Sequence, residues 1–192
     1  MTDPTISVIM PARNCEAYVA EAVQSILDQT FGDFELLVTD DASTDGTYDV
    51  LRGFSDARIS LSRHEAPAGS AETRNELFAR ARGDYIALMD ADDISLPERL
   101  EKQLSYLHGA GYDAAGCAFS HLLPDGTLSP WAPFLSEPAD VRQALLTSFA
   151  MCHASIVFRT SLARVLGGYR ARVGIAYDVE FLIRMSERAE IS

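Results

Sequence analysis

The feature that most constrains the fold of this chain is a regular alternation of short apolar runs with helix-like segments in residues 1–108. The apolar runs lie at residues 6–10, 34–39, 59–62 and 85–89. Helices are expected after them, at residues 17–27, 47–54, 71–81 and 97–107. Short continuous apolar runs are typical of strands buried on both faces. We therefore predict an α/β fold: a Rossmann-like, mostly parallel sheet with helices on both faces.

The second half of the chain has a less regular pattern. Strands are expected at residues 114–121 and 155–158, a loop at 122–138, and helices at 140–146, 161–166 and 177–189. Neither a repeat nor a linker interrupts the chain, so we expect one domain over residues 1–192.

Turn and cap signals set several predicted boundaries. Residues 11–14 are expected to form a turn after the first strand. Ser43 or Thr44 is expected to cap the second helix. Ser95-Leu96-Pro97-Glu98 matches a capping box, so the fourth helix is predicted to start there and to stop before Gly109.

The formal net charge of −12 narrows the class of ligand. It argues against nucleic acid as the main partner and against electrostatic docking on an anionic membrane, because both require clustered Lys and Arg. A protein this acidic that binds a nucleotide must neutralise the nucleotide locally. A divalent cation is the expected means.

Cysteine usage and the N-terminus bear on the cellular compartment. The three cysteines, Cys15, Cys117 and Cys152, form no framework or metal-ligand spacing, which favours reduced thiols in the cytoplasm. No signal peptide and no apolar run of about 20 residues is present, so the chain is expected to be soluble. Peripheral contact with a membrane, at its inner face, stays open.

The most informative motif is Asp90-Ala91-Asp92-Asp93, directly after the fourth apolar run. Three carboxylates within four residues repel one another unless a cation or water lies among them. At the end of a buried strand they would converge on the binding crevice and could hold Mn²⁺ or Mg²⁺. The tetrapeptide alone fits an acidic helix N-terminus equally well.

Polar residues also follow the first two strands and open the third helix. Asp40 and Asp41 end the second strand, where they could accept hydrogen bonds from a base or a ribose; turn chemistry explains Ser43 to Gly46 better. Residues 11–14 would lie beside the same crevice, or simply form a turn. Arg74 could steady the aspartates or reach a diphosphate, or be a surface arginine.

The combined pattern resembles the family 2 glycosyltransferases, which have the GT-A fold. The matching motifs are Ser7-Val8-Ile9-Met10-Pro11-Ala12-Arg13-Asn14, Asp40-Asp41-Ala42-Ser43-Thr44-Asp45, Arg74-Asn75, Gly83-Asp84-Tyr85-Ile86, the DxD segment Asp90-Ala91-Asp92-Asp93 and Leu96-Pro97-Glu98-Arg99-Leu100. They occur in the family's order and span nearly the whole chain.

By this resemblance, residues 1–108 bind a nucleotide-diphosphate sugar, with a UDP-sugar expected. The nucleotide-binding set would be Pro11, Arg13, Asp40, Asp41, Arg74, Asp90 and Ala91. Asp41 would contact the base, Asp90 would lie near the ribose, and Asp92 would be the main metal ligand. The family often has an aromatic residue where Arg13 stands, so the identity of the base stays open.

The resemblance extends to residues 109–192 as an acceptor-side half. His153 opens the segment 153–159, and Asp178 takes the place of the family's catalytic base, with Glu180 as the fallback. The family usually has an acid directly before that base, whereas this chain has Tyr177. The family also commonly carries further C-terminal elements, which leaves open that the chain is a fragment.

The resemblance implies a metal-dependent, inverting transfer of a sugar to a saccharide or lipid-linked acceptor, as in cell-envelope or exopolysaccharide synthesis. Two alternatives remain. A nucleotidyltransferase would normally have a Gly-rich phosphate loop after the first strand, where this chain has residues 11–14 without glycine. A nucleotide-sugar-binding module without turnover would fit Tyr177 in place of the acid.

Overall fold

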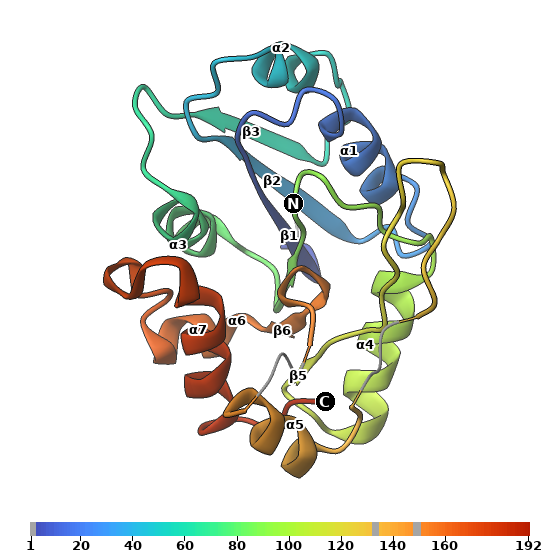
Figure 1. Cartoon of the computed structure of the whole chain (residues 1–192), viewed down its shortest axis with the longest axis vertical. Helices are drawn as coiled ribbons and strands as arrows, with labels where there is room; N and C mark the ends of the chain where they lie inside the picture. The colour runs from blue at the N-terminus through green and yellow to red at the C-terminus, as the bar shows by residue number, and fades with distance from the viewer. Residues whose placement is uncertain (1–2, 132–134, 148–150) are drawn as a thin grey trace.

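The computed structural model describes residues 3–131, 135–147 and 151–192, and its centre is a six-stranded sheet (Figure 1). The strands are β1 (Ile6–Ala12), β2 (Phe34–Asp40), β3 (Ile59–Arg63), β4 (Tyr85–Leu88), β5 (Ala114–Ala115) and β6 (Val157–Arg159). The helices are α1 (Val19–Leu27), α2 (Thr47–Arg52), α3 (Ser70–Arg80), α4 (Arg99–Ala110), α5 (Pro138–Leu145), α6 (Thr160–Leu166) and α7 (Tyr177–Ser186). Two 3₁₀ segments are η1 (His153–Ser155) and η2 (Ala171–Ala176).

The strand order is β3-β2-β1-β4-β6-β5. β1 pairs in parallel with β2 and β4, β2 pairs in parallel with β3, and β6 is antiparallel to both β4 and β5. The chain adds β2 and β3 on one side of β1 and then crosses to place β4 on the other. The strand order therefore reverses between β1 and β4, and such a reversal leaves a crevice at the carboxyl ends of the strands.

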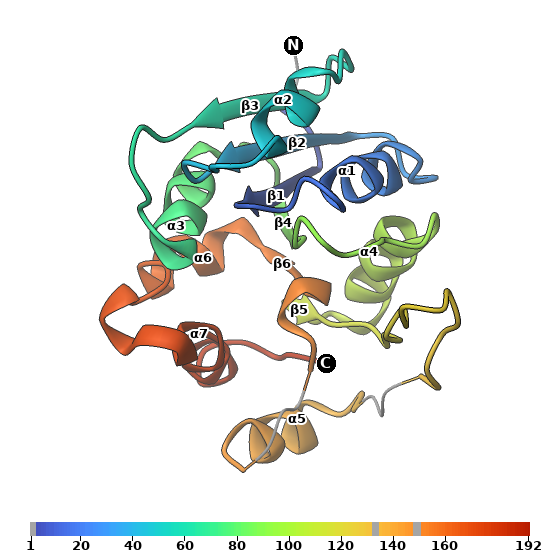
Figure 2. The same ribbon diagram turned by 45° about the horizontal axis from the view of Figure 1, so that its top comes forward.

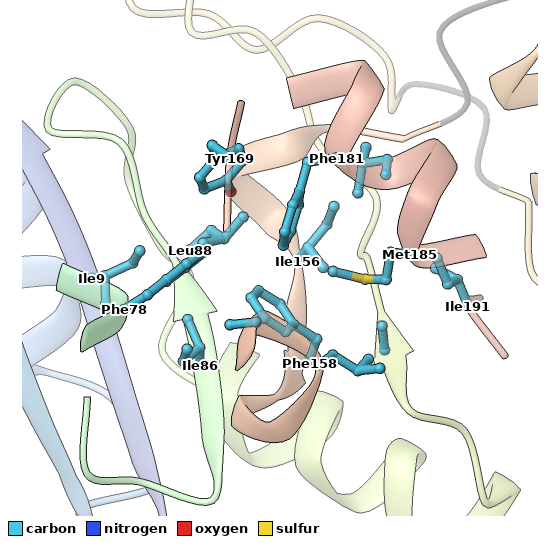
Figure 3. Packing of buried hydrophobic residues seen from close by; sticks show 14 of the residues in the cluster. Ile9, Phe78, Ile86, Leu88, Ile156, Phe158, Tyr169, Phe181, Met185 and Ile191 are labelled. Atoms are coloured by element: carbon cyan, nitrogen blue, oxygen red, sulfur yellow. The ribbon is translucent and has the colours of Figure 1, made fainter. Parts of the chain in front are cut away.

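Each face of the sheet carries its own core, because alternate side chains of a strand point to opposite faces. Ile6, Val8 and Met10 of β1 pack with α1, α2 and α4. Ile9 lies on the other face with α3, α5, α6 and α7. Figure 2 shows the helices on the two sides of the sheet, and Figure 3 shows the second of these cores, where Phe78, Phe158 and Phe181 meet. The predicted α/β architecture is confirmed.

The strand predicted over residues 114–121 is wrong beyond Ala115. Ala115 pairs with Val157 in an antiparallel ladder, so residues 116–121 would have to pair with the segment before Val157. Residues 153–155 of that segment form η1, and no extended partner remains. For the same reason β6 starts at Val157 rather than Ser155. β1, in contrast, continues through Pro11 and Ala12, which were expected in a turn, because Thr39 and Asp40 of β2 lie opposite them.

The predicted capping box is also wrong. The Ser95 hydroxyl accepts a hydrogen bond from Gln29, and α4 begins at Arg99. Gln29 Oε1, not Ser95, accepts the hydrogen bond from the Leu100 N–H in the first turn of α4. α4 does not stop before Gly109 but continues to Ala110, and Gly111 ends it in the left-handed conformation at φ 70°. A glycine is favoured there because it has no Cβ.

The predicted cap of the second helix is wrong as well. The Asp45 carboxylate, not Ser43 or Thr44, accepts the hydrogen bond from the Thr47 N–H at the start of α2. The other predicted helices and strands begin and end within three residues of the observed ones. None of the helices in the described ranges is long and apolar enough to cross a membrane.

Candidate functional site

A pocket of about 340 Å³ opens at the carboxyl ends of β1 and β4, where the strand order reverses. Segments that are far apart in the sequence line it: the end of β1, the start of α3, the loop after β4 and the start of α7. It brings together seven of the predicted site residues, namely Pro11, Arg13, Asp41, Arg74, Asp90, Ala91 and Asp92. The location is the one at which open α/β sheets bind ligands.

Asp41 forms one wall of the pocket and is almost entirely buried. Its Oδ1 accepts hydrogen bonds from the Ala68 N–H at 2.7 Å and from His64 Nδ1 at 2.8 Å, and its Oδ2 accepts one from the Gly69 N–H at 2.9 Å. Burial opposes ionisation of Asp41, but these hydrogen bonds outweigh it and hold its pKa below the ordinary value. The ionised Asp41 carboxylate thus holds the loop before α3 in place.

Arg13 lies at the pocket mouth with nearly half of its side chain exposed. Its Nη1 is 3.9 Å from Asp41 Oδ2, the limit of an ion pair. The guanidinium plane is therefore only loosely held. It can lie against a flat ring in the position where the family often has an aromatic side chain.

Arg74 is a buried residue of the pocket lining that connects the start of α3 with the loop after β4. One guanidinium nitrogen donates to Asp90 Oδ1 and another to the Ser70 hydroxyl. Burial disfavours the charge on Arg74, but the Asp90 carboxylate outweighs it and raises the pKa of Arg74. Arg74 Nε is the only nitrogen or oxygen of a described buried side chain, besides Asp40 Oδ1, without a hydrogen-bond partner.

Asp92 contrasts with Asp90. Its side chain is exposed, it lines the pocket, and in the described part of the chain it makes no hydrogen bond or ion pair. Desolvation and the neighbouring carboxylates of Asp90 and Asp92 raise the pKa of Asp93 to about 6, against the opposing charge of Arg99. Negative charge thus accumulates at this edge of the pocket without a compensating partner for Asp92.

The pocket residues could hold a divalent cation only together with a bound ligand, because the protein alone offers few metal ligands. No group of three or more His, Cys, Asp or Glu side chains able to hold a metal occurs within residues 3–131, 135–147 and 151–192. The carboxylate of Asp92 and the second oxygen of Asp90 are available. A hard cation completes its shell with water and phosphate oxygens, so this donor set suits a metal–diphosphate complex.

Four predicted site residues do not line the pocket: Asp40, His153, Asp178 and Glu180. Asp40 is fully buried behind it, with Oδ2 3.1 Å from Arg63 Nε and Oδ1 unpartnered. His153 is buried, and its Nε2 lies 2.7 Å from the Tyr169 hydroxyl. Burial and the charge of Arg74 lower the pKa of His153 to about 3, so its imidazole is neutral.

Asp178 and Glu180 begin α7 but have different partners. Glu180 Oε1 accepts from Arg170 at 2.8 Å and from Arg184 at 2.7 Å, and Glu180 Oε2 accepts from Arg184 at 2.8 Å. The hydrogen bond from Arg184 is the main cause of the lowered pKa of Glu180. Asp178 is half-buried, and its described hydrogen bond comes from the N–H of Val179.

Sequence reasoning missed several residues of the pocket. Ser70 lines it and accepts hydrogen bonds from Arg74 and from Tyr177. Tyr18 also lines the pocket; the sequence predicts it inside the first helix, but α1 begins at Val19. The signal available for Ser70 was its place after Gly69, whose φ of 91° turns the chain into α3.

Comparison with known proteins gives the family. Residues 7–166 match the family model described as "Glycosyl transferase family 2". This chain belongs to glycosyltransferase family 2. Among its relatives, the putative glycosyltransferase EpsE of Bacillus subtilis (strain 168) is 35% identical over 96% of this chain and 67% of EpsE.

The name of another relative states its donor and its acceptor. UDP-Glc:alpha-D-GlcNAc-diphosphoundecaprenol beta-1,3-glucosyltransferase WfgD of Escherichia coli is 41% identical over 56% of this chain and 42% of WfgD. Among solved structures, S. aureus TarS 1-349 in complex with UDP has a TM-score of 0.82 at 25% identity, covering 98% of this chain and 57% of that chain. The chain thus spans between about two fifths and two thirds of the length of these proteins, and the glycosyltransferase fold is shared.

Proposed function

We propose that this domain binds a nucleotide-diphosphate sugar, specifically a UDP-sugar, and transfers the sugar with inversion to a saccharide or lipid-linked acceptor. The observation that carries the proposal is the convergence of Arg13, Asp41, Arg74, Asp90 and Asp92 on one pocket at the switch point of the sheet. Membership of glycosyltransferase family 2 supports the reaction class.

The names of two related proteins support the choice of substrates. That of WfgD states a UDP-glucose donor and a diphosphoundecaprenol-linked acceptor, and the TarS structure contains UDP. We infer the same classes here: uridine in the donor and a lipid-linked saccharide as acceptor, in the assembly of a cell-envelope or exopolysaccharide. A lipid-linked acceptor implies peripheral contact with a membrane, and the three free cysteines favour its cytoplasmic side.

The metal site that we propose consists of Asp92, with the second oxygen of Asp90, for Mn²⁺ or Mg²⁺. The cation would neutralise charge on the leaving diphosphate. Arg74 holds the first oxygen of Asp90 and so orients that carboxylate toward the pocket. Arg74 is buried and is also hydrogen-bonded to Ser70, which fixes the guanidinium that holds Asp90.

We assign the general base to Asp178 rather than to Glu180. Both oxygens of Glu180 already accept hydrogen bonds from arginines, which stabilises its charge and makes it a weak base. In a single displacement, the acceptor oxygen forms a bond to the anomeric carbon and its proton passes to Asp178. The bond from that carbon to the diphosphate breaks, which inverts the centre.

The second candidate is a module that binds a nucleotide sugar without transfer. Tyr177 favours it, because a phenol lines the pocket where the family usually has an acid. A nucleotidyltransferase is disfavoured, since the segment after β1 that lines the pocket has no glycine.

The donor site is tested by calorimetric titration of UDP, with GDP and ADP as competitors, in Mn²⁺ and in chelator. We expect Asp92→Asn to weaken binding in Mn²⁺ by about tenfold or more and to match the wild type in chelator. Asp49→Asn, an exposed carboxylate of α2, is the matched control and should leave binding unchanged. Binding that ignores both metal and Asp92, or no nucleotide binding at all, would remove the proposed site.

A further inference from the structure

The first turn of α7 is joined to the donor side of the pocket by one hydrogen bond. The Tyr177 hydroxyl donates to Ser70 Oγ at 2.9 Å, across 107 positions of sequence. Among the residues that the structure describes, it is the only hydrogen bond or ion pair between α7 and residues 3–108. Tyr177 and Ser70 both line the pocket.

The Tyr177 ring is anchored on the acceptor side. It meets Tyr169 edge-on, with ring centroids 5.5 Å apart at 85°, and it meets His153 at 6.4 Å and 89°. Tyr169 in turn packs on Phe181 of α7 at 4.3 Å and on Phe78 of α3 at 5.2 Å. Figure 3 shows Tyr169 at the end of this aromatic core. The ring of Tyr177 is thus held from one side and its hydroxyl from the other.

Apart from the ion pair between Arg170 and Glu180 at 2.8 Å, little ties the segment before α7 to the helix. Every residue of η2 is exposed, Gly174 breaks it at φ 72°, and no side chain caps α7 at Ala176. A helix start without a side-chain cap leaves several N–H groups without partners inside the helix. The Tyr177 hydroxyl therefore provides the described polar contact that ties the first turn, and with it Asp178, to the donor side of the pocket.

Ser70 connects this anchor to the donor site. Its oxygen accepts from Arg74, which also holds Asp90, as well as from Tyr177. A hydroxyl oxygen has two acceptor positions, and both are taken by these bonds. Asp90, Arg74, Ser70 and Tyr177 therefore form one hydrogen-bonded chain from the end of β4 to the start of α7.

We infer that Tyr177 is a positioning residue: its hydrogen bond to Ser70 holds the first turn of α7 at the donor pocket, so that Asp178 faces the sugar. The inference rests on the proposed function for the role of Asp178. It also gives Tyr177 a purpose at the place where the family usually has an acid. A carboxylate would not donate to Ser70 while ionised, whereas a phenol does.

The test uses Tyr177→Phe, which removes the hydroxyl and keeps the ring in its aromatic contacts. The matched control is Tyr106→Phe, because the Tyr106 hydroxyl also pairs with a distant serine, Ser192, at 2.8 Å but away from the pocket. Ser70→Ala removes the partner of the same bond, and Ser70→Thr keeps a hydroxyl there.

The first measurement is hydrogen exchange of the peptide that covers α7, in the full chain without ligand. The amides of Phe181 and Leu182 close the first turn on the carbonyls of Tyr177 and Asp178. We expect Tyr177→Phe and Ser70→Ala to speed their exchange about tenfold and Tyr106→Phe to leave it unchanged. Unchanged exchange in Tyr177→Phe would overturn the inference, whether or not the protein is an enzyme.

The second measurement is UDP release from UDP-glucose, UDP-galactose and UDP-N-acetylglucosamine in Mn²⁺, with water as acceptor. We expect Tyr177→Phe to lower kcat about tenfold at unchanged KM, UDP affinity and Tm, and Ser70→Thr to restore what Ser70→Ala loses. The kcat of the Tyr177→Phe/Ser70→Ala double variant should be no lower than that of the less active single variant. Faster exchange with unchanged kcat would overturn the positioning role; metal-dependent UDP binding without any release in the wild type would instead contradict the proposed transfer.

Discussion

At the residue scale, carboxylates close together in the sequence differ sharply in their surroundings. Asp40 is sealed behind the pocket, whereas its neighbour Asp41 forms the pocket wall and fixes the loop before α3. Asp90 is held by Arg74, and Asp92 is unpartnered in the described structure. Only the last arrangement leaves a carboxylate fully available to a cation, so the proposed roles follow from partners rather than from residue type.

Replacing each acid of α7 in turn distinguishes the proposed general base, Asp178, from Glu180, to which we assign a structural role. We expect Asp178→Asn to lower the transfer rate by about 10²–10⁴-fold at unchanged UDP affinity, since an amide cannot take the proton. Glu180→Gln should lower Tm, because it weakens the contacts with Arg170 and Arg184, and retain most of the transfer. Rates with an identified donor and acceptor, together with thermal melting, check both. Full activity of Asp178→Asn would contradict the assignment.

We expect the stability of the fold to depend on pH through His64. Its ring nitrogens lie 2.8 Å from Asp41 and 2.7 Å from Glu76. The hydrogen bond with Asp41 is the main cause that raises the pKa of His64 above its ordinary 6.5, while burial opposes the rise. A folded pKa above the unfolded one means that His64 stabilises the fold fully below pH 6.5 and loses this contribution as pH rises through the raised pKa.

Urea unfolding between pH 5 and 9 tests this sign. The free energy of unfolding should fall with rising pH more steeply in the wild type than in His64→Gln. Asp93, with a pKa raised from 3.8 to about 6, contributes a fall of the same sign at the acid end of this range and is present in both proteins. The difference between the two curves therefore isolates His64, and parallel curves would show that its protonation does not stabilise the fold.

At the element scale, α4 shows how a helix end depends on more than a glycine. Gly109 lies inside the helix, is exposed, and has open space where a Cβ would stand. Gly111 also has open space, but its φ of 70° disfavours any side chain. Two glycines two residues apart thus have opposite structural roles.

This difference predicts substitutions of opposite sign. Gly109→Ala should raise the free energy of unfolding by about 0.5–1 kcal/mol, since alanine favours the helix interior. Gly111→Ala should lower it by about 1 kcal/mol, since alanine is strained in the left-handed conformation. Chemical denaturation of both variants checks the pair, and equal changes would show that α4 ends elsewhere.

At the scale of the whole molecule, one sheet serves both cores and both halves of the chain. β6 from the second half pairs with β4 from the first, and helices from both halves cover the face that contains Ile156. Ile26 of α1 lies in the core on the opposite face. Since the strands between the two cores are shared, loss of either core should expose the other.

We therefore propose that residues 1–192 are a single domain and unfold in one step. Ile26→Val and Ile156→Val should each cost about 0.5–1.5 kcal/mol and lower the same thermal transition by a few degrees. The double variant should show the sum, because the sites are far apart. Calorimetry with circular dichroism checks this, and two separable transitions would indicate two folding units.

The local pattern of the chain was enough to predict the α/β architecture and the sheet edge at which the pocket opens. Short apolar runs such as Ile6–Met10 have few alternatives to buried strands, and Asp90 and Asp92 follow such a run at the sheet edge where ligands bind. The family resemblance added the roles expected of Asp92 and Asp178, which are still proposals. These predictions succeed because they depend only on residues that are adjacent in the sequence.

Only the tertiary structure decided what depends on distant partners. Ser95 is not the cap of α4 because Gln29, distant in the sequence, accepts the hydrogen bond from the Leu100 N–H. The strand after Ala115 stops because η1 removes its partner. The contact of Tyr177 with Ser70, 107 positions away, could not be read from either segment alone. Hydrogen bonds and packing act through space, so partners that the fold brings together override or complete what local sequence favours.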